Sequence, residues 1–378
     1  MDKKKIYLSL ILILIVALLL RVYNIDAKAD GTDEKWSFIM TDQIVDGTFL
    51  QNVGTHAHVP LFYVFLAPFW WLSGKSILAL RIVMILLGLV SIIVTFFLAK
   101  KILGEKIALL TAYLLALSPF HLIYSQHIRA YALLMIMCVG AIIIMMKYLK
   151  DEKIIGLIGL TAIYIAAFYI HMFAAFFVFA QYSIFLVLKI TKETKIKLKP
   201  IIISGIITAL GWALWIPFFK EQFKFNITQG AIKTITTLNP MHVPYTWYKY
   251  AVAMDFSYAL KNHFSVILLA VGLVGLAIYG LYRVWKTGKK EFIIMAGNVA
   301  LPVVFLAAIG IFFPVYSFRY VSYLVPLFMM LVAKSLIEIQ NAKVRYTALA
   351  IITIIWLIVL KVYWSVFTNY KWGFEFAI

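Results

Sequence analysis

Charge is scarce in this chain. Only 13% of its 378 residues are Asp, Glu, Lys or Arg, whereas 64% are hydrophobic. No long hydrophilic stretch is present that would fold as a separate soluble domain. Cys138 is the single cysteine, which excludes an intramolecular disulfide. These absences exclude an ordinary soluble protein and predict one membrane-embedded unit over residues 1–378.

Apolar runs of roughly 17–25 residues recur along the chain, each long enough to cross a hydrocarbon core of ~30 Å as a helix. The predicted fold is therefore an all-α polytopic membrane protein with about eleven transmembrane helices. The predicted spans cover about 6–22, 77–100, 106–123, 128–148, 154–171, 173–189, 200–219, 264–285, 291–313, 320–338 and 346–365.

The first apolar run follows Lys3-Lys4-Lys5 and ends near Leu20, so it resembles a signal peptide. Ala27-Lys28-Ala29 even supplies a small-residue cleavage pattern. The polar gap over 21–26 separates that pattern from the apolar run. We therefore expect an uncleaved signal anchor.

Lysine and arginine outnumber acidic residues, giving a net charge of +19. In a soluble protein this charge would suggest nucleic acid as a partner, but here the basic residues are dispersed in short loops, where they orient helices and meet anionic lipid headgroups. With the N-terminus in the cytoplasm, 21 of the 35 basic residues fall in six short inside segments. The pattern predicts a multi-pass protein of the cell membrane that binds no nucleic acid.

Two longer polar segments, 23–76 and 220–263, then lie on the extracytoplasmic face. The apolar run Val59–Leu72 is short and contains Pro60 and Pro68, and counting it as a span would invert every later loop. We expect it to lie along the outer interface. The segment 220–263 contains a sequon at Asn226 and is rich in residues suited to a membrane interface or to sugar stacking: Tyr245, Trp247, Tyr248, Lys249, Tyr250 and Asp255.

The first outside segment also predicts an amphipathic interfacial helix over 34–46, ended by Gly47. Its apolar positions fall at helical spacing: Trp36, Ile39, Met40 and Ile44. Thr32 or Asp33 is the expected N-cap.

The adjacent carboxylates Asp33 and Glu34 begin this helix. Asp33 is either a helix cap alone or, because it would sit at the membrane surface, also a general base. Adjacent side chains on a helix point about 100° apart, so the pair is not an opposed acid and base. One carboxylate that reacts and a neighbour that orients it is the more plausible arrangement.

An ordered set of short motifs resembles the GT-C class of membrane glycosyltransferases, and within it the protein mannosyltransferase and lipid A aminoarabinose transferase group. The resemblance begins with Arg21-Val-Tyr, Asp33-Glu34, Asp46-Gly47 and His58-Val-Pro60-Leu61-Phe-Tyr63. It continues with Ala79-Leu-Arg81, Leu117-Ser-Pro119, Tyr124-Ser125, Arg129-Ala-Tyr131, Ser317-Phe-Arg319-Tyr320 and Pro326. All of these motifs fall on the predicted outside face.

The resemblance implies a GT-C-like fold, to which the composition adds no separate soluble domain. It also implies a catalytic module over 1–219, followed by the outside loop 220–263 and C-terminal spans over 264–378. It implies a polyprenyl-phosphate-linked sugar as donor, extracytoplasmic transfer, and Asp33 as catalytic base, with Glu34 beside it. A glycan, lipid or protein would be the acceptor, through a hydroxyl or an amine-bearing group. The transferred sugar is a hexose or a pentose. One departure from the group is Val59, where many relatives have a basic residue or a proline.

Such a transfer needs cations for the departing phosphate, and Lys35, Arg129 and Arg319 are the candidates. Each of these arginines could instead extend to the interface, but each is followed closely by a motif tyrosine, Tyr131 or Tyr320. Direct attack on the anomeric carbon would invert its configuration.

Arg81 is a further candidate for the donor site, and His58 is expected in the donor pocket. His56 and His58 invite a metal interpretation, but an H-x-H pair without a carboxylate partner does not indicate a metal, and we expect no cofactor.

A transporter or flippase of lipid-linked saccharides is the alternative function, because its composition would be the same. Transporters place ionisable groups near the middle of the membrane, whereas such groups are nearly absent from the predicted spans. A catalytically inactive subunit is the third possibility, against which the intact Asp33-Glu34 pair argues.

Overall fold

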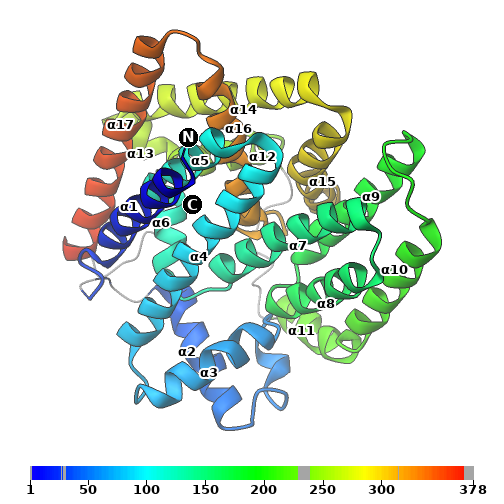
Figure 1. Ribbon diagram of the computed structural model, residues 1–378. Helices are drawn as coiled ribbons and strands as arrows, with labels where there is room; N and C mark the ends of the chain where they lie inside the picture. The colour runs from blue at the N-terminus through cyan, green and yellow to red at the C-terminus, as the bar shows by residue number, and fades with distance from the viewer. Residues whose placement is uncertain (1, 27, 29–30, 229–238, 314, 370–378) are drawn as a thin grey trace.

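The computed structural model describes residues 2–26, 28, 31–228, 239–313 and 315–369. Within these ranges the chain is helical, with no strand, as predicted (Figure 1). The first half contains α1 (Lys3–Val22), α2 (Thr32–Val45), η1 (Val53–Thr55), α3 (Leu61–Leu72), α4 (Ile77–Leu103), α5 (Glu105–Leu117), α6 (Pro119–Gln126), α7 (Tyr131–Asp151), α8 (Ile154–Ile170) and α9 (Ala174–Ile190). The second half contains α10 (Leu198–Ala213), α11 (Ile216–Thr228), α12 (His242–Val252), α13 (Phe256–Asn262), α14 (Phe264–Thr287), α15 (Lys289–Phe312), η3 (Phe318–Leu324), α16 (Val325–Glu338) and α17 (Ala342–Asn369).

Seven of the described helical segments are long and apolar enough to cross a membrane, and two bent helix pairs raise that number to nine. Two further predicted spans correspond to α8 and α9, which have 17 residues each. Helices of that length extend about 25 Å, slightly less than a ~30 Å hydrocarbon core. The multi-pass helical fold is therefore confirmed, whereas a total of eleven crossings stays a prediction.

Two predicted spans are not straight helices, which corrects the sequence-based boundaries. The span predicted at 106–123 bends by 61° between α5 and α6, and the one at 200–219 bends by 51° between α10 and α11. The first bend has a clear cause. Pro119 occupies the first turn of α6, and the Ser118 hydroxyl accepts a hydrogen bond from the His121 backbone amide as its N-cap.

The short helices of the first loop follow the prediction closely. α2 has the expected extent to within two residues, and α3 has only 12 residues, about 18 Å, which is too short to cross a membrane. The N-cap is Gly31, which corrects the expected Thr32 or Asp33. The Glu34 side chain accepts from the Gly31 amide at 3.4 Å, so the helix starts one residue earlier than a side-chain cap at Thr32 would set it.

The helices that follow the second polar segment close the bundle. α16 is buried along nearly its whole length against α5 and α14, whereas α1 and α10 expose apolar faces of the kind that lipid covers. One hydrophobic cluster draws side chains from α1 to α17 and holds both halves of the chain together.

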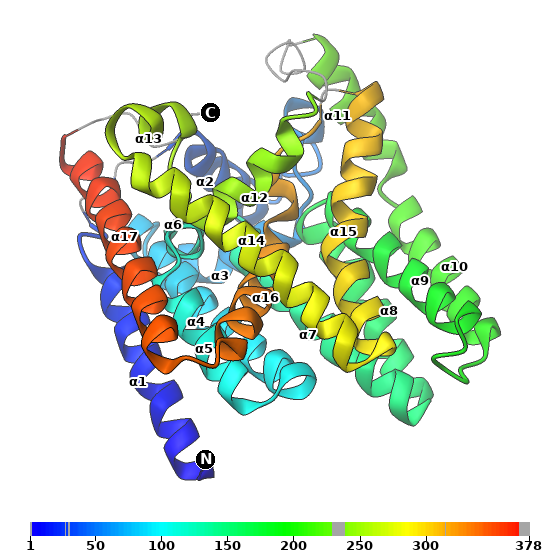
Figure 2. The same cartoon turned by 90° about the horizontal axis from the view of Figure 1, so that it is seen from above.

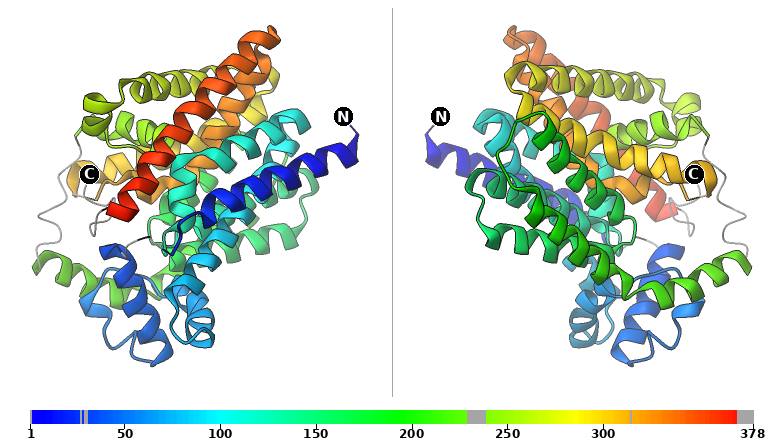
Figure 3. Two further views of the ribbon diagram at one scale, coloured as in Figure 1. Left: turned by 90° about the vertical axis from the view of Figure 1, so that its left-hand side faces the viewer. Right: turned by 90° about the vertical axis from the view of Figure 1, so that its right-hand side faces the viewer.

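Helices from both long polar segments, α2 from the first and α12 and α13 from the second, lie at the same end of the molecule. In Figure 2 the N-terminus lies at the bottom, while α2, α12 and α13 lie toward the top. α2 and α3 form the blue group that projects at the bottom of both panels of Figure 3. Helices from both polar segments therefore lie at the end of the molecule that contains the Asp33-Glu34 pair of α2.

Candidate active site

Asp33 meets Arg319 at this end of the molecule. Asp33 lies in the first turn of α2, and Arg319 lies in η3, 286 residues later in the chain. Arg319 Nη1 donates to Asp33 Oδ2 at 2.9 Å, with about 30% of the Asp33 side chain and 23% of the Arg319 side chain still exposed. The structure thus brings together two residues that the sequence motifs single out, and leaves the carboxylate accessible.

A second arginine approaches the same carboxylate. Arg129 lies in the loop between α6 and α7, and its Nη1 donates to the Asp33 backbone carbonyl at 3.3 Å. Burial alone would raise the pKa of Asp33, but the guanidinium groups of Arg129 and Arg319 outweigh it and hold that pKa below its ordinary value. Asp33 is therefore ionised at neutral pH, and two cations surround one anion.

Glu34 differs from Asp33 although it is the next residue. Its carboxylate is fully buried, binds Lys28 Nζ at 2.8 Å and accepts from the Ile128 amide at 2.9 Å. Burial opposes ionisation of Glu34, but Lys28 chiefly offsets it and lowers the pKa to about 2. Glu34 thereby connects α2 to the loop that carries Arg129. Such a contact fits a residue that positions the neighbouring Asp33.

Two of the cations predicted for the donor site, Arg81 and Lys35, lie away from the Asp33 carboxylate. Arg81, in α4, is buried, and its guanidinium donates to the Ile25 carbonyl at 3.1 Å and lies 3.8 Å from Glu34. Lys35 lies exposed on α2. Arg81 thus belongs with the network that holds Glu34, whereas Lys35 faces outward.

Aromatic side chains form a wall beside the two arginines. Tyr131 is buried at the start of α7, and its ring lies 5.8 Å from that of His171. Tyr320 stacks on Phe173 with ring centroids 4.1 Å apart, and it lies 5.5 Å from His171. Both motif tyrosines therefore lie next to His171, which is located in the turn between α8 and α9.

His58 completes the site from the first loop. Its ring lies 5.8 Å from that of Tyr63 and 6.0 Å from that of His56. Burial, followed by Arg129, holds the pKa of His58 below its ordinary value, so its imidazole is neutral at physiological pH. Among the residues that the structure describes, no group of three or more His, Cys, Asp or Glu side chains could hold a metal ion.

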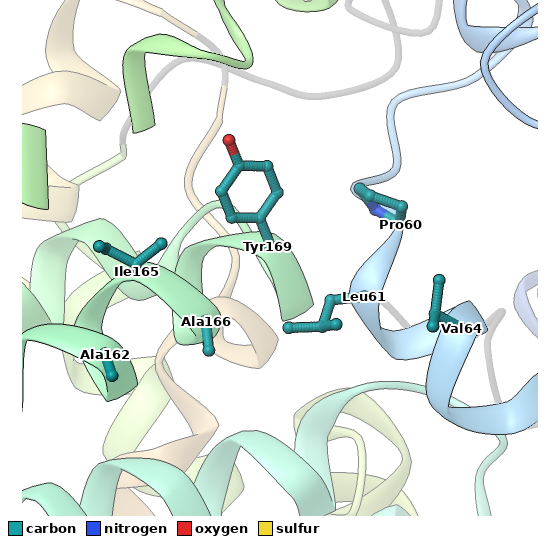
Figure 4. A pocket seen from close by; sticks show the side chains of 7 residues that line it. All are labelled: Pro60, Leu61, Val64, Ala162, Ile165, Ala166 and Tyr169. Atoms are coloured by element: carbon teal, nitrogen blue, oxygen red, sulfur yellow. The ribbon is translucent and has the colours of Figure 1, made fainter. Parts of the chain in front are cut away.

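An apolar cavity of about 420 Å³ begins two residues after His58. The N-cap residue of α3 and two residues of its first turns line one wall, and four residues of α8 line the other: Pro60, Leu61, Val64, Ala162, Ile165, Ala166 and Tyr169 (Figure 4). Such a surface suits a hydrocarbon chain rather than a sugar.

Sequence reasoning missed three residues of this region as site members. His127 is buried and favours the ionised forms of both Asp33 and Glu34, and Tyr63 lies near Arg129. His171 lies between the two arginines and the two motif tyrosines. His127 lies two residues before Arg129 and Tyr63 ends the His58 motif, so their positions carry a signal, whereas His171 stands alone between two apolar runs.

Part of the chain matches a known protein family in sequence. Residues 56–217 match the family model described as dolichyl-phosphate-mannose-protein mannosyltransferase. The matched region includes His58, Arg81, Arg129 and Tyr131, but neither Asp33 nor Arg319. No curated protein matched this chain in sequence.

Solved structures share the fold at low sequence identity. ArnT from Cupriavidus metallidurans bound to undecaprenyl phosphate superposes with a TM-score of 0.60 and 15% identity, covering 90% of this chain and 63% of that one. AglB from Archaeoglobus fulgidus is an oligosaccharyltransferase solved in complex with an inhibitory peptide and a dolichol-phosphate. It superposes with a TM-score of 0.57 and 10% identity, covering 98% of this chain and 55% of that one. The chain thus spans less than two thirds of the length of either structure. Residues 56–217 therefore resemble the dolichyl-phosphate-mannose-protein mannosyltransferase family, and the chain as a whole shares the fold of ArnT and AglB.

Proposed function

We propose that this chain transfers a sugar from a polyprenyl monophosphate donor to an acceptor hydroxyl or amine-bearing group on the extracytoplasmic face. The observation that carries the proposal is the ion pair of the partly exposed Asp33 with Arg319. It lies among aromatic side chains, at the end of the molecule where helices from both long polar segments lie. This arrangement supplies a base and a cation in one place.

Asp33 is the general base of the proposed reaction. Its ionised, accessible carboxylate takes the proton of the acceptor nucleophile, which attacks the anomeric carbon while the phosphate leaves from the opposite side. Attack and departure on opposite sides invert the configuration at that carbon. Glu34, locked to Lys28 and Ile128, fixes the helix turn that carries the base.

Arg319 has a second role that its pairing with Asp33 suggests. A phosphate is the natural bidentate partner of a guanidinium, so a bound donor competes with Asp33 for Arg319. When the donor phosphate draws Arg319 away, the Asp33 carboxylate loses a stabilising charge and becomes a stronger base. Donor binding would thus activate the base at the moment it is needed.

The polyprenyl tail fits the apolar cavity between α3 and α8. That cavity begins at Pro60, two residues after His58 and next to the turn of α3 that carries Tyr63. A tail in this cavity would leave its phosphate end near His58 and Arg129. The relative ArnT has been solved with undecaprenyl phosphate, a lipid of this class.

The test is to overexpress wild type and Asp33→Asn in native membranes and to quantify the endogenous polyprenyl phosphosugars by mass spectrometry. Loss of a general base lowers the rate by about 10²–10⁴-fold. One lipid-linked sugar should therefore fall with wild type and stay at the background level with Asp33→Asn. Asp46→Asn is the matched control, because Asp46 lies at the exposed end of the same helix.

Unchanged lipid-linked sugars in all three membranes, at equal expression, would contradict the proposal. A transporter gives a different result: it redistributes a lipid-linked saccharide between the two leaflets without changing the total amount. Measuring both the total and the outer-leaflet pool therefore separates the two functions.

A further inference from the structure

Lys249 is a buried lysine that the reaction above does not use. It lies in α12, within the second polar segment, and only 6% of its surface is exposed. Its Nζ lies 5.3 Å from the centre of the Phe318 ring and 5.7 Å from that of Tyr245. Phe318 directly precedes Arg319, so this ammonium group is held beside the proposed active site.

Among the described residues, no carboxylate lies within ion-pair distance of Lys249. Asp255 is the acidic residue whose charge acts on it, but that carboxylate caps α13 by accepting from the Tyr258 amide at 3.0 Å and also accepts from the Tyr245 hydroxyl. Burial, opposed by Asp255 and reinforced by Arg319, lowers the pKa of Lys249 to about 8. A buried ammonium without an anion is costly, and the aromatic faces offset only part of that cost.

Arg319 also has donors to spare. One of its terminal nitrogens donates to Asp33, while its Nε has no hydrogen-bond partner among the residues that the structure describes. Three cations, Arg129, Arg319 and Lys249, lie near two carboxylates, those of Asp33 and Asp255, which leaves a local excess of positive charge. Such an excess is typical of a site that receives an anion.

We propose that Lys249 and Arg319 together form an oxyanion site for a phosphoryl group, with Lys249 as its second cation. This proposal deepens the proposed function and rests on it for the role of Arg319. The phosphoryl group belongs either to the polyprenyl donor or to a free or acceptor-borne phosphate. The two sources share their chemistry and differ in whether a lipid tail is attached.

The test measures ligand binding to the purified full-length protein in nanodiscs, through ligand-dependent thermal stabilisation over a concentration series. The probes are polyprenyl monophosphate, the corresponding polyprenol and inorganic phosphate. Lys249→Met keeps an unbranched side chain against the two rings but removes the charge, and Lys249→Arg restores a cation. Lys261→Met is the matched control, because Lys261 is an exposed lysine of the same polar segment.

Loss of a charge-assisted hydrogen bond should raise the Kd for polyprenyl monophosphate roughly tenfold or more in Lys249→Met. Polyprenol binding should not change, Lys249→Arg should recover most of the affinity, and Lys261→Met should match wild type. A loss confined to inorganic phosphate would keep the oxyanion site but exclude the lipid as its source.

Equal Kd values of wild type and Lys249→Met for both phosphate probes would overturn the proposal. A different result would overturn the proposed donor: wild type that binds polyprenol as tightly as polyprenyl monophosphate. The inorganic phosphate measurement would still decide the role of Lys249, so the two failures are distinguishable.

Discussion

Asp33 and Glu34 illustrate how two identical charges on neighbouring residues acquire different roles. A rotation of about 100° per helical residue sends Asp33 toward η3 and Glu34 into the protein. The first keeps contact with solvent, while the second is surrounded by Lys28, Arg81 and a backbone amide. Helix geometry therefore leaves the Asp33 carboxylate accessible, as the proposed general base requires, and buries the Glu34 carboxylate.

Glu34→Gln should destabilise the full-length protein by about 3–5 kcal/mol at pH 7, because it breaks the buried ion pair of Glu34 with Lys28. The folded state lowers the pKa of Glu34 from 4.5 to about 2, so its stabilisation is complete above about pH 4.5 and is lost as the pH falls toward 2. Thermal unfolding in detergent from pH 7 to pH 3 measures both effects.

The wild-type melting temperature should fall on acidification, and that of Glu34→Gln should start lower and fall less. Asp46→Asn, which removes an exposed carboxylate from the same helix, should unfold like wild type. A Glu34→Gln protein as stable as wild type at pH 7 would show that the Lys28 pair contributes nothing.

Sequence alone predicts the site residues only in part. Asp33, Arg129 and Arg319 belong to short motifs in a recognisable order, and the structure brings them together. Lys249 was grouped only with interface aromatics, because burial beside Arg319 arises from packing between distant segments. Arg81 stays a prediction for the donor site, and its hydrogen bond to the Ile25 carbonyl is a tertiary contact that no local pattern encodes.

At the scale of elements, apolar run length predicts the existence of spans but not their straightness. The run over 106–123 reads as one helix because its hydrophobicity is continuous across Ser118-Pro119. The structure places a 61° bend there and satisfies the free carbonyls of α5 with Arg21 from α1. The bend directs α6, and with it the Arg129 loop, toward the candidate active site.

Arg21→Met should destabilise the protein by several kcal/mol, about 1–3 kcal/mol for each buried acceptor left unsatisfied. Arg21 donates to the carbonyls of Ala116 at 3.0 Å and Leu115 at 3.3 Å and contacts His121 Nδ1 at 2.8 Å. Thermal unfolding of the purified protein measures the loss. Arg345→Met, at the partly exposed start of α17, is the control, and equal stability of both variants would contradict the bridging role.

At the scale of the molecule, the basic loops predict that the N-terminus and 191–199 lie inside while 23–76 lies outside. Because Cys138 is the single cysteine and is buried, new cysteines report topology without a competing thiol. Asp46→Cys should react with a membrane-impermeant maleimide added to intact cells, whereas Lys195→Cys should react only after the membrane is opened. Both positions are exposed. The reverse pattern would invert the orientation and move the active site to the cytoplasm.

The 286 residues that separate Asp33 from Arg319 set the order of events during biosynthesis. At about 5–20 residues per second, a ribosome needs roughly 15–60 s to reach Arg319 after Asp33 has been made. The ion pair is therefore absent from the emerging chain until η3 has been synthesised. A truncated product that stops before η3 would retain the proposed base but lack its arginine partner, so translation itself delays the proposed activity until η3 has been synthesised.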